Sequence, residues 1–111
     1  MRNVMDDLYE TILDRKANPA EGSYTSYLFE KGLDKILKKC GEETAEVIIA
    51  AKNGNTDDLK AEIGDLMYHL LVLLAEKGLR PEELYTLLEE RRKKTGNLKP
   101  ISSYGRGASL C

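Results

Sequence analysis

The chain has 111 residues, with 17 basic and 19 acidic side chains and a formal net charge of -2 at pH 7. This length suits one domain with a modest core, and the balanced charge argues against nucleic acid or an anionic membrane as a partner. Its two cysteines form neither a disulfide framework nor a metal-type pair. Since neither a membrane span nor a signal peptide is indicated, we expect a cytoplasmic protein.

The predicted elements begin with a helix over residues 4–16, for which Asn3 is a plausible N-cap. Residues 18–22 contain proline and glycine and should end this helix. The hydroxyl-rich segment 23–29 is predicted as a loop with one helical turn. Its hydroxyl groups could also contact a ligand.

Three further helices complete the predicted set. The second covers residues 32–52 and is followed by Gly54 as a stop, and the third covers residues 56–77. The fourth runs from Pro81 to Lys94. No strand is predicted, so the expected fold class is all-α. We expect a four-helix antiparallel bundle.

Five carboxylates form two clusters, one on the second predicted helix and one on the third. Their spacings are Glu-Glu-x-x-Glu and Glu-x-x-Asp, and their members are Glu42, Glu43, Glu46, Glu62 and Asp65. At about 100° per residue, each cluster lies on one flank of the apolar stripe of its helix. His69 shares the second flank. If the two helices pack antiparallel, all five carboxylates could reach one groove.

Such a groove favours a cation. Like charges one helical turn apart repel by a few tenths of a kcal/mol per pair. Mg²⁺ prefers oxygen ligands and is commonly held by a few carboxylates together with phosphates. A glutamate-rich helix is also often a solvated face, and the spacing alone leaves that interpretation open.

Four stretches of the sequence carry a resemblance to a known family. They are Ser23-Tyr24-Thr25-x-x-Leu28-Phe29, Gly32-x-Asp34-Lys35-Ile36-x-x-Lys39-x-Gly41-Glu42-Glu43-x-x-Glu46, Ile49-Ala50-Ala51-Lys52-Asn53, and Glu62-x-x-Asp65-Leu66-x-Tyr68-His69-x-Leu71-Val72-Leu73-Leu74. With these motifs, the chain resembles phosphoribosyl-ATP pyrophosphohydrolase from about residue 8 to residue 91. That family belongs to the MazG-like all-α nucleoside triphosphate pyrophosphohydrolases. The acidic motifs alone indicate the superfamily, and the other motif residues indicate the narrower family.

The resemblance implies an activity and a site. The reaction would be hydrolysis of phosphoribosyl-ATP to phosphoribosyl-AMP and pyrophosphate, the second step of histidine biosynthesis. The catalytic and metal-binding residues would be Glu42, Glu43, Glu46, Glu62 and Asp65. The ion would be Mg²⁺, with Mn²⁺ as an alternative. Candidates for contacting the substrate are Lys35, Lys39, Arg15, Lys52 and Asn53.

The resemblance ends before the C-terminus. We expect residues 1–96 to form the all-α pyrophosphohydrolase domain and residues 97–111 to form a loosely ordered tail.

Two other functions stay open. One is a housecleaning pyrophosphohydrolase of the same superfamily that acts on free or damaged nucleotides. The other is a non-catalytic helical interaction module that needs no metal. A di-iron carboxylate bundle is disfavoured because it requires two Glu-x-x-His motifs, whereas the sequence contains one histidine, His69.

A homodimer is also predicted. Residues 66–75 are apolar nearly all round the helix, with Leu71 and Val72 off the main stripe. One chain of this size has few other helices to cover them. We therefore expect the second and third helices to pack against those of a second copy, and a charge at Val72 to dissociate the pair. The alternative is a monomer in which both residues lie beneath segment 23–29.

Overall fold

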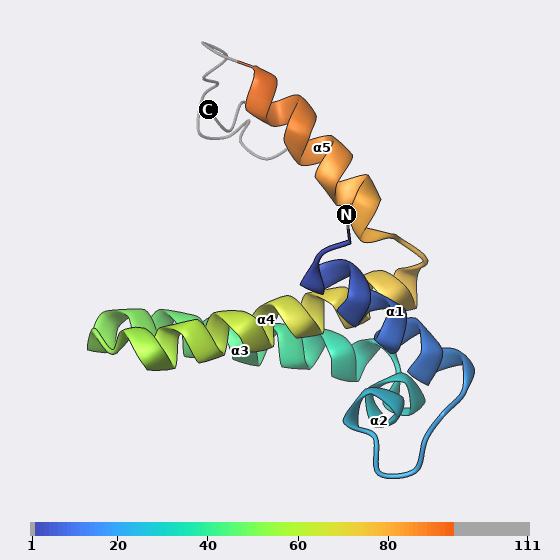
Figure 1. The fold of residues 1–111 in the computed structure, drawn as a ribbon. Helices are drawn as coiled ribbons and strands as arrows, with labels where there is room; N and C mark the ends of the chain where they lie inside the picture. The colour runs from blue at the N-terminus through green and yellow to red at the C-terminus, as the bar shows by residue number, and fades with distance from the viewer. Residues whose placement is uncertain (1, 95–111) are drawn as a thin grey trace. The chain divides into compact units, whose positions relative to one another are not determined.

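The computed structural model describes residues 2–94, which form helices and connecting turns without a strand (Figure 1). The five helices of this part are α1 (Val4–Ala17), α2 (Tyr24–Lys31), α3 (Leu33–Asn53), α4 (Thr56–Lys77) and α5 (Pro81–Lys93). The all-α class is confirmed. The predicted tail, residues 97–111, lies outside the described residues. None of the helices within residues 2–94 has both the length and the apolar composition needed to cross a membrane.

The helix ends follow the signals in the sequence. The side chain of Asn3 caps α1 by accepting a hydrogen bond from a backbone N–H one turn on, at 2.9 Å. Gly54 ends α3 with φ 76°, a left-handed conformation that glycine adopts without steric cost. Asn55 then caps α4, and Pro81 occupies the first turn of α5. These residues confirm the predicted boundaries to within about one residue.

The prediction for segment 23–29 is wrong, because Tyr24–Lys31 forms the helix α2. Ser23 caps this helix by accepting a hydrogen bond from the backbone N–H of Ser26 at 3.1 Å. Gly32 ends it with φ 92°. Leu28 is fully buried and anchors the helix in the core. The described helices therefore number five rather than four.

α1 to α4 belong to one compact unit and α5 to another. Within the first unit, α3 and α4 form a long antiparallel hairpin around the turn at Gly54 (Figure 1). α1 and α2 lie at the end of the hairpin away from that turn, so the rest of it extends beyond them. The core lies where the four helices meet and contains Tyr9, Ile12, Leu28, Ile36, Leu71, Val72 and Ala75.

The burial of Leu71 and Val72 corrects the argument for a dimer. They are 3% and 0% exposed within a single chain, in the same core cluster as Leu28 of α2. The side chains that share this cluster with them come from α1, α2 and α3 of the same chain, so a second copy is not needed to cover them. A charge at Val72 would therefore disrupt the core of one chain rather than a contact between copies. The homodimer itself stays a prediction.

Candidate active site

Three carboxylates meet across the α3–α4 hairpin. They belong to Glu43 on α3 and to Glu62 and Asp65 on α4, and one oxygen from each lies within 4.8 Å of the other two. Glu62 and Asp65 are three residues apart and therefore neighbours on one face of their helix. The turn at Gly54 brings that face beside Glu43. The cluster thus depends on helical spacing and on one short turn.

The electrostatics of this cluster favour a positive partner. The pKa of Glu62 is raised, first by its partial burial, then by a side-chain hydrogen bond with Glu43 and by the nearby negative charges of Glu43, Asp65 and Glu46. Because these carboxylates repel one another, the charged form of Glu62 is disfavoured. A bound cation would offset that repulsion.

The donor atoms fit Mg²⁺. All three are carboxylate oxygens, the ligands that this ion prefers. At a Mg–O distance of about 2.1 Å, two oxygens on one ion lie at most about 4.2 Å apart. The oxygens of Glu43, Glu62 and Asp65 are already within 4.8 Å of one another, so small side-chain rotations would bring them onto one ion.

The other two predicted acids lie beside this cluster rather than in it. Glu42 is exposed, and the Nζ atom of Lys39 lies 4.0 Å from its carboxylate and 3.9 Å from that of Glu43. Glu46 contributes negative charge at Glu62. The structure thus brings together three of the five predicted carboxylates.

The predicted substrate-binding residues lie at several places. Lys39 is beside the cluster, and Lys35 is one helical turn earlier on the same face of α3. Arg15 is near the end of α1, where it pairs with a neighbouring aspartate at 2.8 Å. Lys52 and Asn53 are the last two residues of α3, next to the hairpin turn.

Arg15 also lines a hollow of about 1070 Å³ beside α1 and α2. The charged residues lining it are of both signs: Arg15, Lys16, Glu21, Glu30 and Glu76. The ammonium group of Lys16 already donates to the backbone carbonyl of Ala75 at 2.9 Å. None of the three clustered carboxylates lines this hollow, so it is distinct from the acidic cluster.

A polar connection that the sequence pattern does not reveal joins α2 to α4. His69 is 5% exposed; its Nδ1 lies 2.7 Å from the carbonyl oxygen of Asp65, and its Nε2 lies 2.9 Å from the hydroxyl of Tyr24. A carbonyl only accepts, so Nδ1 donates to Asp65, and Nε2 shares a hydrogen bond with the Tyr24 hydroxyl. The hydroxyl groups of Thr25 and Tyr68 form a second bond between the two helices. The helical wheel placed His69 correctly but gave no sign of its partner.

An all-helical fold whose acidic cluster joins two antiparallel helices is consistent with the all-α nucleoside triphosphate pyrophosphohydrolases. A family model described as phosphoribosyl-ATP pyrophosphohydrolase matches residues 5–92. The chain belongs to the phosphoribosyl-ATP pyrophosphohydrolase family.

Relatives from several bacteria agree with this assignment. The chain is 60% identical over 98 residues to a phosphoribosyl-ATP pyrophosphatase of Clostridium novyi. The matched region covers 88% of this chain and 89% of that protein. It is 59% identical over 102 residues to a protein of the same name from Listeria innocua, and the matched region covers 89% of this chain and 98% of that protein. It is also 57% identical over 91 residues to a histidine biosynthesis bifunctional protein HisIE of Caldanaerobacter subterraneus, covering 82% of this chain and 44% of that protein.

Proposed function

We propose that this chain hydrolyses phosphoribosyl-ATP to phosphoribosyl-AMP and pyrophosphate in histidine biosynthesis, with Mg²⁺ as its metal. The observation that carries the proposal is the meeting of Glu43, Glu62 and Asp65 in a chain of this family. Relatives bearing that activity in their names cover most of the chain. Glu42 and Glu46 flank the same cluster and belong to the proposed site.

The chemistry follows from the charges. A triphosphate would be repelled by bare carboxylates, so Glu43, Glu62 and Asp65 need a cation between them and the substrate. Mg²⁺ held there would stabilise the charge that develops on the leaving pyrophosphate and lower the pKa of a bound water. A carboxylate of the cluster that is not engaged by the ion can accept the proton of the attacking water.

Basic residues of α3 would complete the site. Lys39 lies against Glu42 and Glu43, so its ammonium group is close to where the phosphates would bind. Lys35 is one turn further along the same face. These positions favour Lys39 and Lys35 as phosphate contacts over Arg15, which is paired on α1.

A substrate panel tests the activity. With Mg²⁺ present, we expect kcat/KM for pyrophosphate release from phosphoribosyl-ATP to exceed that from ATP by at least about 100-fold, because a site that pairs polar groups of its substrate rejects molecules lacking them. Comparable rates with ordinary nucleoside triphosphates would instead indicate a housecleaning enzyme. Absence of pyrophosphate with every compound would indicate the non-catalytic module.

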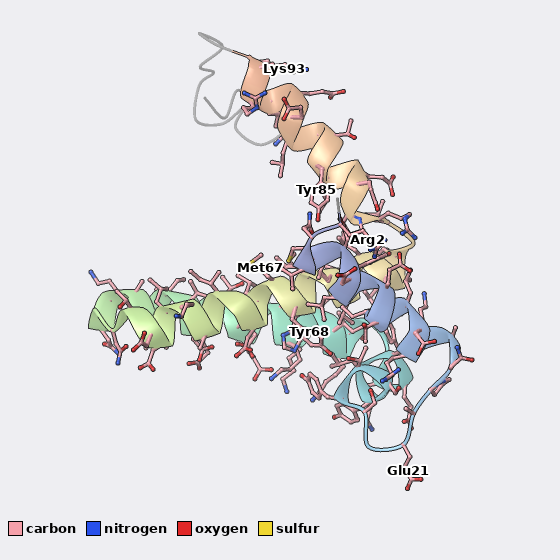
Figure 2. The ribbon with its side chains drawn as sticks, viewed as in Figure 1. Arg2, Glu21, Met67, Tyr68, Tyr85 and Lys93 are labelled. Atoms are coloured by element: carbon pink, nitrogen blue, oxygen red, sulfur yellow. The ribbon has the colours of Figure 1, made fainter. Side chains whose placement is uncertain are left out.

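We also propose a homodimer, now on the basis of a different face from the predicted one. Ile63, Met67 and Leu70 are about two-fifths exposed and lie on one face of α4. Ile48 and Ile49 of α3 are more exposed still. Removing apolar surface from water contributes about 25 cal/mol per Å², so covering the exposed parts of these residues with a second copy would be favourable. In Figure 2, Met67 and Tyr68 lie on different sides of the hairpin.

Met67→Lys should therefore weaken self-association, because it places a charge in the middle of this apolar face. Sedimentation equilibrium at low micromolar concentration should give a dimer for the wild type and a shift towards the 12.5 kDa monomer for the variant. Val4→Lys adds the same charge at another exposed apolar position and should leave the mass unchanged. A folded wild-type protein at monomer mass would refute the dimer.

A further inference from the structure

Three tyrosine rings are stacked beside the α2–α4 contact. The ring of Tyr24 lies 6.2 Å from that of Tyr68, with 30° between their planes. It lies 6.1 Å from the ring of Tyr27, with 25° between their planes. Tyr24 is thus the ring that the other two share, and the stack leads from the half-buried Tyr68 to the exposed Tyr27.

The inner part of this stack is held in place. The Tyr24 hydroxyl is hydrogen-bonded to the buried His69, whose ring also meets that of Tyr24 edge-on at 5.7 Å. Tyr68 is held by its hydroxyl contact with Thr25. Tyr24 and Tyr27 are nevertheless 44% and 37% exposed. An exposed aromatic ring whose orientation is already restrained by contacts with buried side chains loses little conformational entropy when a ligand binds to it.

Positive charge surrounds the outer ring. The Nζ atoms of Lys31 and Lys35 lie over the Tyr27 ring, 5.8 and 6.0 Å from its centre. Along α3, Lys35, Lys39 and Glu43 follow one another at intervals of four residues, about 6 Å per step. This line of side chains joins the aromatic stack to the acidic cluster, with ammonium groups in between.

We propose that Tyr27 and Tyr24 form the surface on which the purine base of the substrate stacks, while its phosphates extend past Lys35 and Lys39 towards the acidic cluster. This inference rests on the proposed function, since it assigns the base of the same substrate. A purine is an aromatic ring system, so it can extend the tyrosine stack at Tyr27 in place of the ammonium groups that lie over that ring, which are then free to meet the phosphates. Stacking of one base on an aromatic side chain strengthens binding by roughly 5- to 150-fold.

The kinetic test compares two substitutions at Tyr27. Tyr27→Leu removes the aromatic ring and should raise KM for phosphoribosyl-ATP by at least about 5-fold, the lower end of one stacking contact. The value of kcat should stay nearly constant, because the base is held equally in the ground and transition states. Tyr27→Phe keeps the ring and should stay within about 2-fold of wild type in KM. Tyr85→Leu, at a similarly exposed tyrosine of α5, is the control. An unchanged KM in Tyr27→Leu would overturn the proposal.

A second measurement uses the wild-type protein and does not depend on the variants or on turnover. In proton NMR, titration with phosphoribosyl-AMP or AMP should shift the ring signals of Tyr27 upfield, because the base would lie over that ring. Ribose 5-phosphate, which lacks a base, should leave them unmoved. Equal shifts with all three compounds, or no shift with any, would contradict stacking. If phosphoribosyl-ATP is not hydrolysed but AMP still produces the shift, the proposed reaction fails and the base site stands.

Discussion

Glu43→Gln is expected to slow pyrophosphate release from phosphoribosyl-ATP at least about 100-fold, the typical cost of removing one strong electrostatic contact to a transition state. Asp65→Asn should have an effect of the same size. Both substitutions keep the shape of the side chain and remove the negative charge from the cluster on the hairpin. Initial rates at saturating substrate and Mg²⁺ would measure the effect.

Folding provides the control for these variants. Because Glu43 and Asp65 both add to the repulsion at Glu62, removing one charge should leave the melting temperature of the metal-free protein unchanged or raise it. Glu30→Gln makes the same chemical change on the exposed face of α2 and should keep the wild-type rate. Near-wild-type rates for Glu43→Gln or Asp65→Asn would remove the site assignment.

Excess EDTA is expected to abolish turnover, and added Mg²⁺ or Mn²⁺ should restore it. Without a cation, the carboxylates of Glu43, Glu62 and Asp65 would face the phosphates of the substrate directly. Mg²⁺ should also raise the melting temperature of the wild-type protein, because an ion that binds the folded state stabilises it by mass action. That increase should shrink in Glu43→Gln. Full turnover in EDTA would eliminate the metal-dependent mechanism.

Helix boundaries could be predicted because their signals are local. Asn3, Gly54, Asn55 and Pro81 determine the ends of their helices through backbone geometry and capping bonds, which depend on a few neighbouring residues. The helix α2 was missed because segment 23–29 is short and rich in hydroxyl groups. Ser23 as a cap and Gly32 as a stop could have revealed it.

The candidate site was predictable only in part. Helical periodicity placed the acids on one flank of each helix, and the short turn brought the two flanks together. Glu42 and Glu43 point about 100° apart on the helix, but periodicity does not show which of these directions faces α4, so it could not separate Glu43 from the exposed Glu42. It also could not find the bond between His69 and Tyr24, because that contact depends on how α2 packs against α4.

The hairpin has a consequence for how this site forms during folding. Glu43, Glu62 and Asp65 lie within one continuous stretch of two helices joined by a short turn. The contacts that assemble the cluster are therefore close in sequence, and contacts of this kind form quickly. Such a unit can be joined to other domains without rearranging its acids. In the bifunctional relative from Caldanaerobacter subterraneus, the region that matches this chain is less than half of the protein.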